Sequence, residues 1–98
     1  MIKPASFHPM AEVELNEASE YYESREIGLG AAFLDEVERA VNSILENSES
    51  AQVILKSVRS KILWRFPYSL MYSIHLDVIR ILAVASQKRR PFYWRSRK

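Results

Sequence analysis

The stretch Val78-Ile79-Arg80-Ile81-Leu82-Ala83-Val84-Ala85 decides the fold. It is almost continuously apolar and rich in β-branched side chains, which is typical of a central strand buried on both faces. Arg80 is its only charged residue, and a charge inside such a strand costs free energy unless it is paired or reaches water. Two interpretations of Arg80 stay open: its head group extends to water along an edge, or it is displayed on an uncovered sheet face.

Two segments before this strand alternate with a period of two, as half-buried strands do. They cover residues 62–66 and 70–74, and Trp64 and Phe66 are expected in the core. The links between the segments are short, which predicts antiparallel neighbours. We therefore expect a three-stranded antiparallel meander, while residues 53–55 form either a further short strand or part of a connection.

The first half of the chain predicts two amphipathic helices. One starts at Pro9, which suits the first helical position, and the second runs through residues 33–45 with helical periodicity. We interpret Gly28-Leu29-Gly30 as the turn between them, since no strand precedes it and no Lys-Ser/Thr follows it, as a phosphate-binding loop requires. His8 is expected to cap or precede the first helix.

These elements together predict an α+β fold. An N-terminal edge strand within residues 2–7 is followed by a helical hairpin that packs on one face of the meander. The other sheet face has no obvious cover in this scheme. It and the C-terminal segment from Gln87 onward should carry most of the positive charge.

Length and composition restrict the function classes. Ninety-eight residues predict a single domain over residues 1–98. The absence of cysteine excludes disulfides and thiol chemistry, and two histidines are too few for a histidine-based metal site. We expect no metal, no cofactor and no membrane partner, and a cytoplasmic location, because the sequence has neither a long apolar run nor a signal-peptide pattern.

The charges divide between the two halves of the chain. Residues 1–49 carry three basic and eleven acidic side chains, a net charge of −8, whereas residues 50–98 carry eleven basic and one acidic, a net charge of +10. Aromatic side chains interleave with the basic ones, most densely from Lys88 to Arg95. Arginine with tyrosine or tryptophan suits RNA, and it equally suits a protein partner.

An ordered series of short motifs resembles the ParE branch of the RelE/ParE toxin superfamily over nearly the whole chain. The first-half motifs are Phe7-His8-Pro9, Glu14-Leu15, Glu17-Ala18, Tyr21-Tyr22-Glu23, Gly28-Leu29-Gly30 and Phe33-Leu34. The second-half motifs are Trp64-Arg65-Phe66-Pro67-Tyr68, Tyr72, Ile81-Leu82-Ala83-Val84-Ala85 and Arg89-Arg90-Pro91-Phe92-Tyr93-Trp94.

The resemblance implies the toxin of a type II toxin–antitoxin pair, a plasmid stabilisation protein neutralised by a small cognate antitoxin. Oligomers would form through that antitoxin. ParE-type members inhibit DNA gyrase without known hydrolytic chemistry, whereas RelE-type members cut messenger RNA in the ribosome. A third possibility is a degenerate member that has lost its toxicity and keeps only its partner.

Individual positions bear on this choice by resemblance. Lys88 falls near the strand-end arginine of the RelE-type ribonucleases and Tyr93 near their tail tyrosine, but Ser69 stands where they carry another arginine. The incomplete set favours the ParE interpretation. Ser86 replaces a histidine that relatives often carry after the central strand.

Two sets of candidate site residues follow. Under the ribonuclease alternative the catalytic residues would be Arg65, Arg80, Lys88 and Tyr93. The candidate residues for binding the target or the antitoxin are Arg65, Tyr68, Arg80, Lys88, Arg89, Arg90, Tyr93, Trp94 and Arg95.

Overall fold

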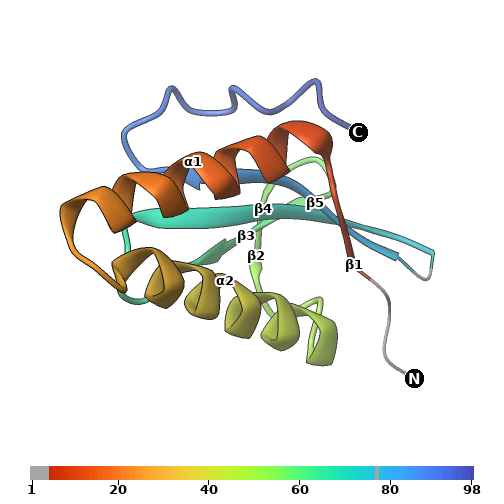
Figure 1. Ribbon diagram of the computed structural model, residues 1–98. Coiled ribbons are helices and arrows are strands. Elements are labelled where there is room, and N and C mark those ends of the chain that lie inside the picture. Colours follow the sequence, from red (N-terminus) through yellow and green to blue (C-terminus); the bar gives the residue numbers. More distant parts are fainter. Residues whose placement is uncertain (1–4, 77) are drawn as a thin grey trace.

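Two helices and a five-stranded sheet make up the fold in the computed structural model, which describes residues 5–76 and 78–98 (Figure 1). In chain order the elements are β1 (Ala5–Phe7), α1 (Pro9–Arg25), α2 (Leu29–Glu46), β2 (Gln52–Leu55), β3 (Val58–Ile62), β4 (Tyr68–His75) and β5 (Val78–Ser86). The strand predicted within residues 2–7 is thus observed as β1, and residues 2–4 of that prediction lie outside the described part.

The sheet has the strand order β1-β5-β4-β3-β2, with β1 parallel to β5 and all other neighbours antiparallel. The predicted α+β class, N-terminal strand and helical hairpin are confirmed. The meander, however, has four strands and not three. The reason is a tight turn at Lys56, whose φ is 50°, which brings β2 back to pair with β3.

The strand predicted over residues 62–66 lies earlier in the chain. β3 ends at Ile62, and a loop follows that is closed by the Leu63 N–H donating to the Tyr68 carbonyl at 2.9 Å. Phe66 is buried as predicted, but Trp64 is 97% exposed, so its predicted core position is wrong. Alternation of apolar residues assigns faces only within a strand, and these residues belong to a loop.

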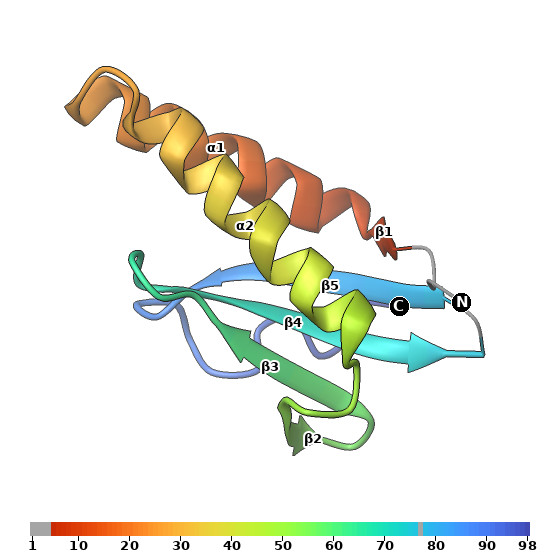
Figure 2. The same cartoon turned by 90° about the horizontal axis from the view of Figure 1, so that it is seen from below.

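The helical hairpin depends on its two glycines. Gly28 ends the turn with φ 89°, in the left-handed region that favours glycine, and the Glu23 carboxylate accepts hydrogen bonds from the N–H groups of Gly28 and Gly30 at 3.0 Å each. A Cβ on Gly30 would lie 2.6 Å from the Ser19 carbonyl oxygen. The turn interpretation of this segment is confirmed, and Gly30 lets the helices lie side by side (Figure 2).

The start of α1 also follows the sequence. Pro9 is its first residue, where the missing N–H of proline is not needed. His8 is the capping residue, and its ring Nδ1 accepts a hydrogen bond from the Met10 N–H at 3.0 Å.

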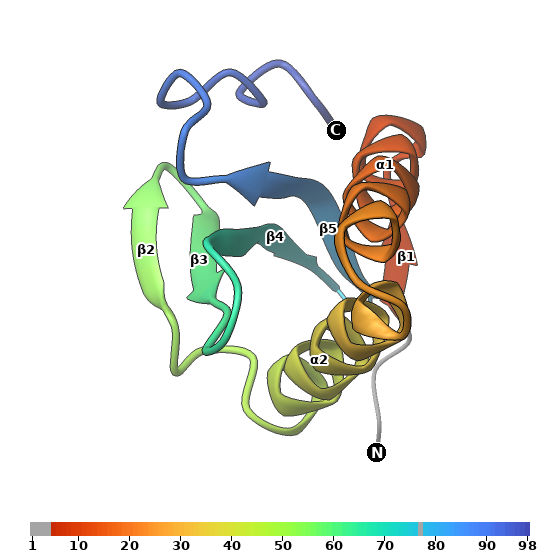
Figure 3. The same ribbon diagram turned by 60° about the vertical axis from the view of Figure 1, so that its left-hand side comes forward.

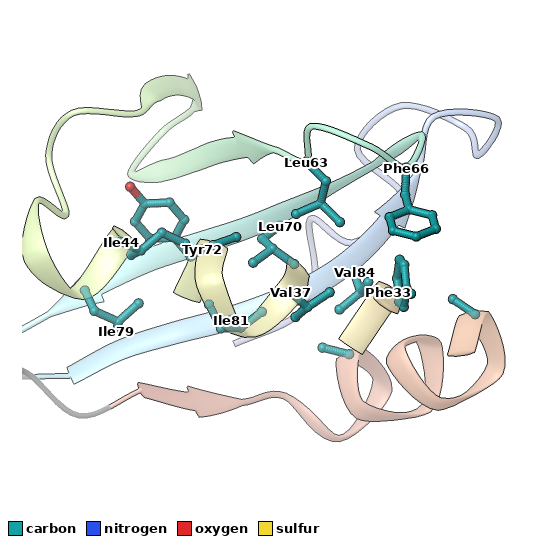
Figure 4. Packing of buried hydrophobic residues seen from close by; sticks show 13 residues of the cluster. Phe33, Val37, Ile44, Leu63, Phe66, Leu70, Tyr72, Ile79, Ile81 and Val84 are labelled. Carbon is teal, nitrogen blue, oxygen red and sulfur yellow. The ribbon is translucent and has the colours of Figure 1, made fainter. Parts of the chain in front are cut away.

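The main core lies between the hairpin and β4–β5. Figure 4 shows Phe33 and Val37 of α2 close to the sheet side chains Leu70 and Val84, all of them buried. Four aromatic rings close one end of this core, with Phe33 5.1 Å from Phe66 between centroids. The other two rings of the group are Tyr22 and Tyr68.

An extra residue in β5 changes which side chains face the hairpin. Tyr72 pairs with Ile81 and Met71 with Ala83, so Leu82 is inserted as a β-bulge. Ile81 packs in the hairpin-side core before the bulge, whereas Ala83 faces the opposite side after it. The bulge therefore places the small side chains of Ala83 and Ala85 on the side of β5 that faces away from the helices.

Residues 87–98, here called the tail, cover this opposite face (Figure 3). Trp94 is 2% exposed and packs on Ala83 and Ala85, with Met71 beside it. The expectation that this sheet face lacks a cover is therefore wrong. Trp94 provides the cover because small alanine side chains leave room for an indole ring.

Within the described residues, neither helix combines the length and the apolar character that a membrane crossing requires.

Candidate functional site

Part of the β5 edge lacks a neighbouring strand. β1 pairs with β5 only as far as Ile81, so beyond that residue the β5 backbone groups that point away from β4 have no strand partner. The Val84 N–H donates instead to the Glu14 carboxylate at 3.0 Å, and the Arg97 guanidinium donates to the Leu82 carbonyl at 3.0 Å. Side chains of α1 and the tail thus replace the missing strand.

Glu14 joins α1 to the tail. The Arg97 guanidinium binds both carboxylate oxygens, at 2.9 and 3.1 Å, and the Tyr93 hydroxyl donates to Oε2 at 2.7 Å. The side chains of Glu14 and Arg97 are only 10% and 12% exposed. Arg89 lies over the Tyr93 ring at 4.0 Å and reaches within 4.0 Å of Oε2. We call these four residues the Glu14 cluster.

Sequence reasoning did not identify Glu14 or Arg97 as partners. A signal for Glu14 was present, since it stands three residues after Ala11 and four before Ala18, within the apolar stripe of α1. A carboxylate at such a position needs a buried hydrogen-bonding partner. The sequence offers no local feature that identifies the partner, because 83 residues separate Glu14 from Arg97.

The pKa of the Tyr93 hydroxyl is raised well above its ordinary value. Burial is the main cause, and the hydrogen bond to Glu14 and the carboxylate charge add to it, while Arg89 and Arg97 oppose it. Tyr93 is therefore protonated at neutral pH, and its hydroxyl donates a hydrogen bond to the Glu14 carboxylate.

This raised pKa predicts a loss of stability in alkali. Below the ordinary tyrosine pKa of 10.0 both the folded and the unfolded chain hold the proton, and the contribution to stability is complete. Above it the unfolded chain loses the proton first, so the free energy of unfolding falls as the pH rises. We expect Tyr93→Phe to flatten this decline in urea unfolding from neutral pH to about pH 11. An unchanged slope would contradict the assignment to Tyr93.

The exposed cations of the tail include Lys88, Arg89, Arg90 and Arg95. We call them the basic surface. Arg89 and Arg90 line a groove of about 260 Å³ between the tail and the sheet, and Met71 and Phe92 are among its other lining residues. An exposed array of guanidinium groups beside an aromatic ring suits a carboxylate-bearing or phosphate-bearing partner.

A neighbouring pocket brings three of the predicted binding residues together. Tyr68, Arg89 and Tyr93 line a space of about 280 Å³, which Tyr21 and Ser86 also border. Burial raises the pKa of the Tyr68 hydroxyl, so it too is a neutral hydrogen-bonding group there. The pocket offers polar contacts but no cluster of His, Asp or Glu suited to a metal ion is found in the described residues.

Arg80 connects three segments of the fold. Its guanidinium donates to the Ser6 hydroxyl and the Phe7 carbonyl at 3.2 Å and to the Lys98 main-chain oxygen at 3.3 Å. The strand register sets it opposite Ser73, on the sheet face that the tail covers. One interpretation of Arg80 placed its head group in water at an edge, and the other placed it on an uncovered sheet face. In the structure the guanidinium is instead hydrogen-bonded to β1 and to the tail.

The remaining predicted residues occupy different environments. Trp94 is buried and anchors the tail, whereas Lys88 is exposed, and its N–H donates to the Ser86 hydroxyl at 3.2 Å. Arg65 lies in the β3–β4 loop, where its N–H donates to the Glu36 carboxylate at 2.7 Å. Neither Arg65 nor Arg80 lines the pocket around Tyr68, so the structure does not gather the four residues of the ribonuclease alternative there.

Comparison with known proteins adds two findings. A family model described as the ParE toxin of the type II toxin–antitoxin system parDE matches residues 5–91. A solved structure entitled "Chromosomal ParDE TA system from P. aeruginosa" is similar with a TM-score of 0.73 and 17% sequence identity, covering 87% of this chain and 96% of that chain. At this identity the likeness concerns the fold. No curated protein gave a match.

Proposed function

The chain belongs to the ParE toxin family of type II toxin–antitoxin systems, and on this premise we propose that it arrests growth by binding a target such as DNA gyrase and is neutralised by a cognate antitoxin. The proposal distinguishes a binding toxin from the ribonuclease alternative. It is supported by the hydrogen bonding and burial of the residues that RNA cleavage would require.

The observation that carries the proposal is the hydrogen bond between the Tyr93 hydroxyl and Glu14. Cleavage of RNA requires a group that takes the proton of a 2′-hydroxyl. Tyr93 is a poor candidate, because its hydroxyl is protonated and donates to the Glu14 carboxylate. Its raised pKa makes the deprotonated form, which could accept a proton, scarce. Ser69, at the position where RelE-type enzymes carry another arginine, is only 7% exposed.

The basic surface supports binding to a protein. Among the described residues, the single salt bridge made by its four cations is the 4.0 Å contact between Arg89 and Glu14. Like charges grouped in this way repel one another, and carboxylates of a partner would offset that repulsion. Phe92 is 38% exposed between them and adds an apolar contact.

Growth and two purified activities test the proposal. Induction of the protein alone is expected to arrest bacterial growth, and co-expression of the small reading frame beside its gene should restore it. Purified protein should inhibit supercoiling by gyrase and leave ribosome-bound messenger RNA intact. Codon-specific cleavage without gyrase inhibition would replace the proposal by the ribonuclease alternative. Normal growth at confirmed soluble expression would instead indicate a non-toxic member of the family.

A double variant of the basic surface provides a finer prediction. We expect Arg89→Ala with Arg90→Ala to weaken binding to gyrase or to the antitoxin by more than about 1 kcal/mol, measured by calorimetry. Urea unfolding should change little, because Arg89 is 54% exposed and its ion pair is long. Arg25→Ala, at the exposed end of α1, is the matched control. Equal binding by the double variant and the control would show that the basic surface is merely hydrated.

A further inference from the structure

A pair of large apolar side chains stands in water beside α2. Trp64 is 97% exposed and Ile62 is 67% exposed, although their neighbours Leu63 and Phe66 are buried. The two border a groove of about 340 Å³ between the end of β3 and the α2 side chains, Arg39 among them. Exposed tryptophan with an adjacent aliphatic side chain is characteristic of protein interaction sites. We call this feature the Trp64 groove.

The loop that carries Trp64 is held by hydrogen bonds on both sides. The Leu63 N–H donates to the Tyr68 carbonyl at 2.9 Å, and the Arg65 N–H donates to the Glu36 carboxylate at 2.7 Å. The backbone on either side of Trp64 is therefore fixed before any partner arrives. A fixed loop lowers the entropy cost of binding to the indole ring.

The charges around the groove indicate the partner. Arg39 and Lys61 line it and Arg65 follows Trp64 in the loop, and none of the three has a carboxylate within salt-bridge distance in the described residues. The Glu36 carboxylate also lines the groove, but it is 7% exposed and engaged by the Arg65 N–H. A groove that two large apolar side chains border, with Arg39 and Lys61 in its lining and Arg65 beside it, is complementary to an acidic segment that carries an apolar anchor.

A second copy of the chain fits this surface poorly. A two-fold symmetric contact through Trp64 would place Arg39, Lys61 and Arg65 of one copy against the same cations of the other. Like charges facing one another across an interface oppose association. The charges therefore favour a different, acidic chain.

We propose that the Trp64 groove docks an acidic amphipathic segment of the antitoxin, with one large apolar side chain entering the groove beside Trp64. This inference rests on the proposed function, which supplies the partner. The groove shares no lining residue with the pocket around Tyr68 or with the groove under the tail. The groove is thus a separate contact site for the antitoxin, and a change at Trp64 should weaken antitoxin binding while toxicity is kept.

The experiment measures the affinity of the full-length protein for the full-length antitoxin encoded beside its gene. Trp64→Ala is expected to raise the dissociation constant at least about tenfold, and Lys61→Glu should raise it too and reduce its salt dependence. Leu76→Ala and Ile27→Ala are matched controls, since these side chains are 94% and 93% exposed in other loops, and should leave it unchanged. In cells, Trp64→Ala should still arrest growth while the antitoxin no longer restores it.

The outcomes separate the inference from the function on which it rests. If the wild-type protein is toxic and neutralised but Trp64→Ala binds the antitoxin as tightly as the controls do, the docking proposal is overturned and the proposed function stands. If the wild-type protein neither arrests growth nor binds the antitoxin, both are overturned. Wild-type dimers in sedimentation that Trp64→Ala abolishes would assign the groove to a second copy and also overturn the proposal.

Discussion

Glu14→Ala is expected to lower the free energy of unfolding by about 3–5 kcal/mol, because it leaves a buried guanidinium without its counter-charge. Arg97 is 12% exposed and binds both oxygens of Glu14, so water cannot readily replace the carboxylate. The same substitution removes the acceptor of the Tyr93 hydroxyl and of the Val84 N–H at the open edge of β5. Urea unfolding followed by circular dichroism gives the change directly.

Two controls isolate the charge of Glu14. Glu20→Ala removes an exposed carboxylate from the same helix and should change the free energy of unfolding by less than about 0.5 kcal/mol. Glu14→Gln keeps the shape and one acceptor but not the charge, and should lie between the two. If Glu14→Ala matched Glu20→Ala, the ion pair with Arg97 would not be a stabilising contact.

Trp94→Ala is the second substitution for which we expect a large effect. Removing a fully buried indole costs about 3–5 kcal/mol, as the lost burial and the cavity add together. Trp94 is 2% exposed and is the side chain that fixes the tail to Ala83 and Ala85. Its loss should therefore loosen the tail, which Tyr93 and Arg97 still join to Glu14, as well as destabilise the fold. The basic surface would then be less well fixed, and under the proposed function binding to gyrase should weaken even where the variant remains folded.

The chain contains its own control for this prediction. Trp64→Ala is the same chemical change at a side chain that is 97% exposed, so the free energy of unfolding should shift by less than about 0.5 kcal/mol. The two variants compared in one urea series separate burial from residue type. Similar losses in both would contradict the burial of Trp94.

The sequence predicted those parts of the fold that follow from local periodicity. β5, the two helices and the Gly28 turn are all observed, because each has a pattern or a conformational requirement within a few residues. Trp64 was misplaced since a period of two continues from β3 into a loop where it no longer determines orientation. Residues 53–55 are compatible with either a strand or a connection in the sequence, because a four-residue strand such as β2 (Gln52–Leu55) has too few residues to show a pattern.

The candidate site was predicted less well, because its contacts join distant parts of the chain. The charge and aromatic content of the segment around Tyr93 predict that it binds a partner, and this stays a prediction. That Trp94 anchors the tail and that Tyr93 and Arg97 bind Glu14 follows only from the three-dimensional packing. A buried carboxylate in a helix stripe indicates that a partner exists but does not identify it.

The pairing of β1 with β5 also affects the order in which the molecule assembles. Ser6 and Arg80 are joined across 74 residues, and Glu14 and Arg97 across 83. Contacts between residues so far apart in the sequence predict slow folding, over roughly milliseconds to seconds. During synthesis the helical hairpin emerges before any strand that can cover its apolar face, and the basic surface takes shape last. A newly made molecule thus displays the α2 side of the Trp64 groove before it can display the surface proposed to be toxic.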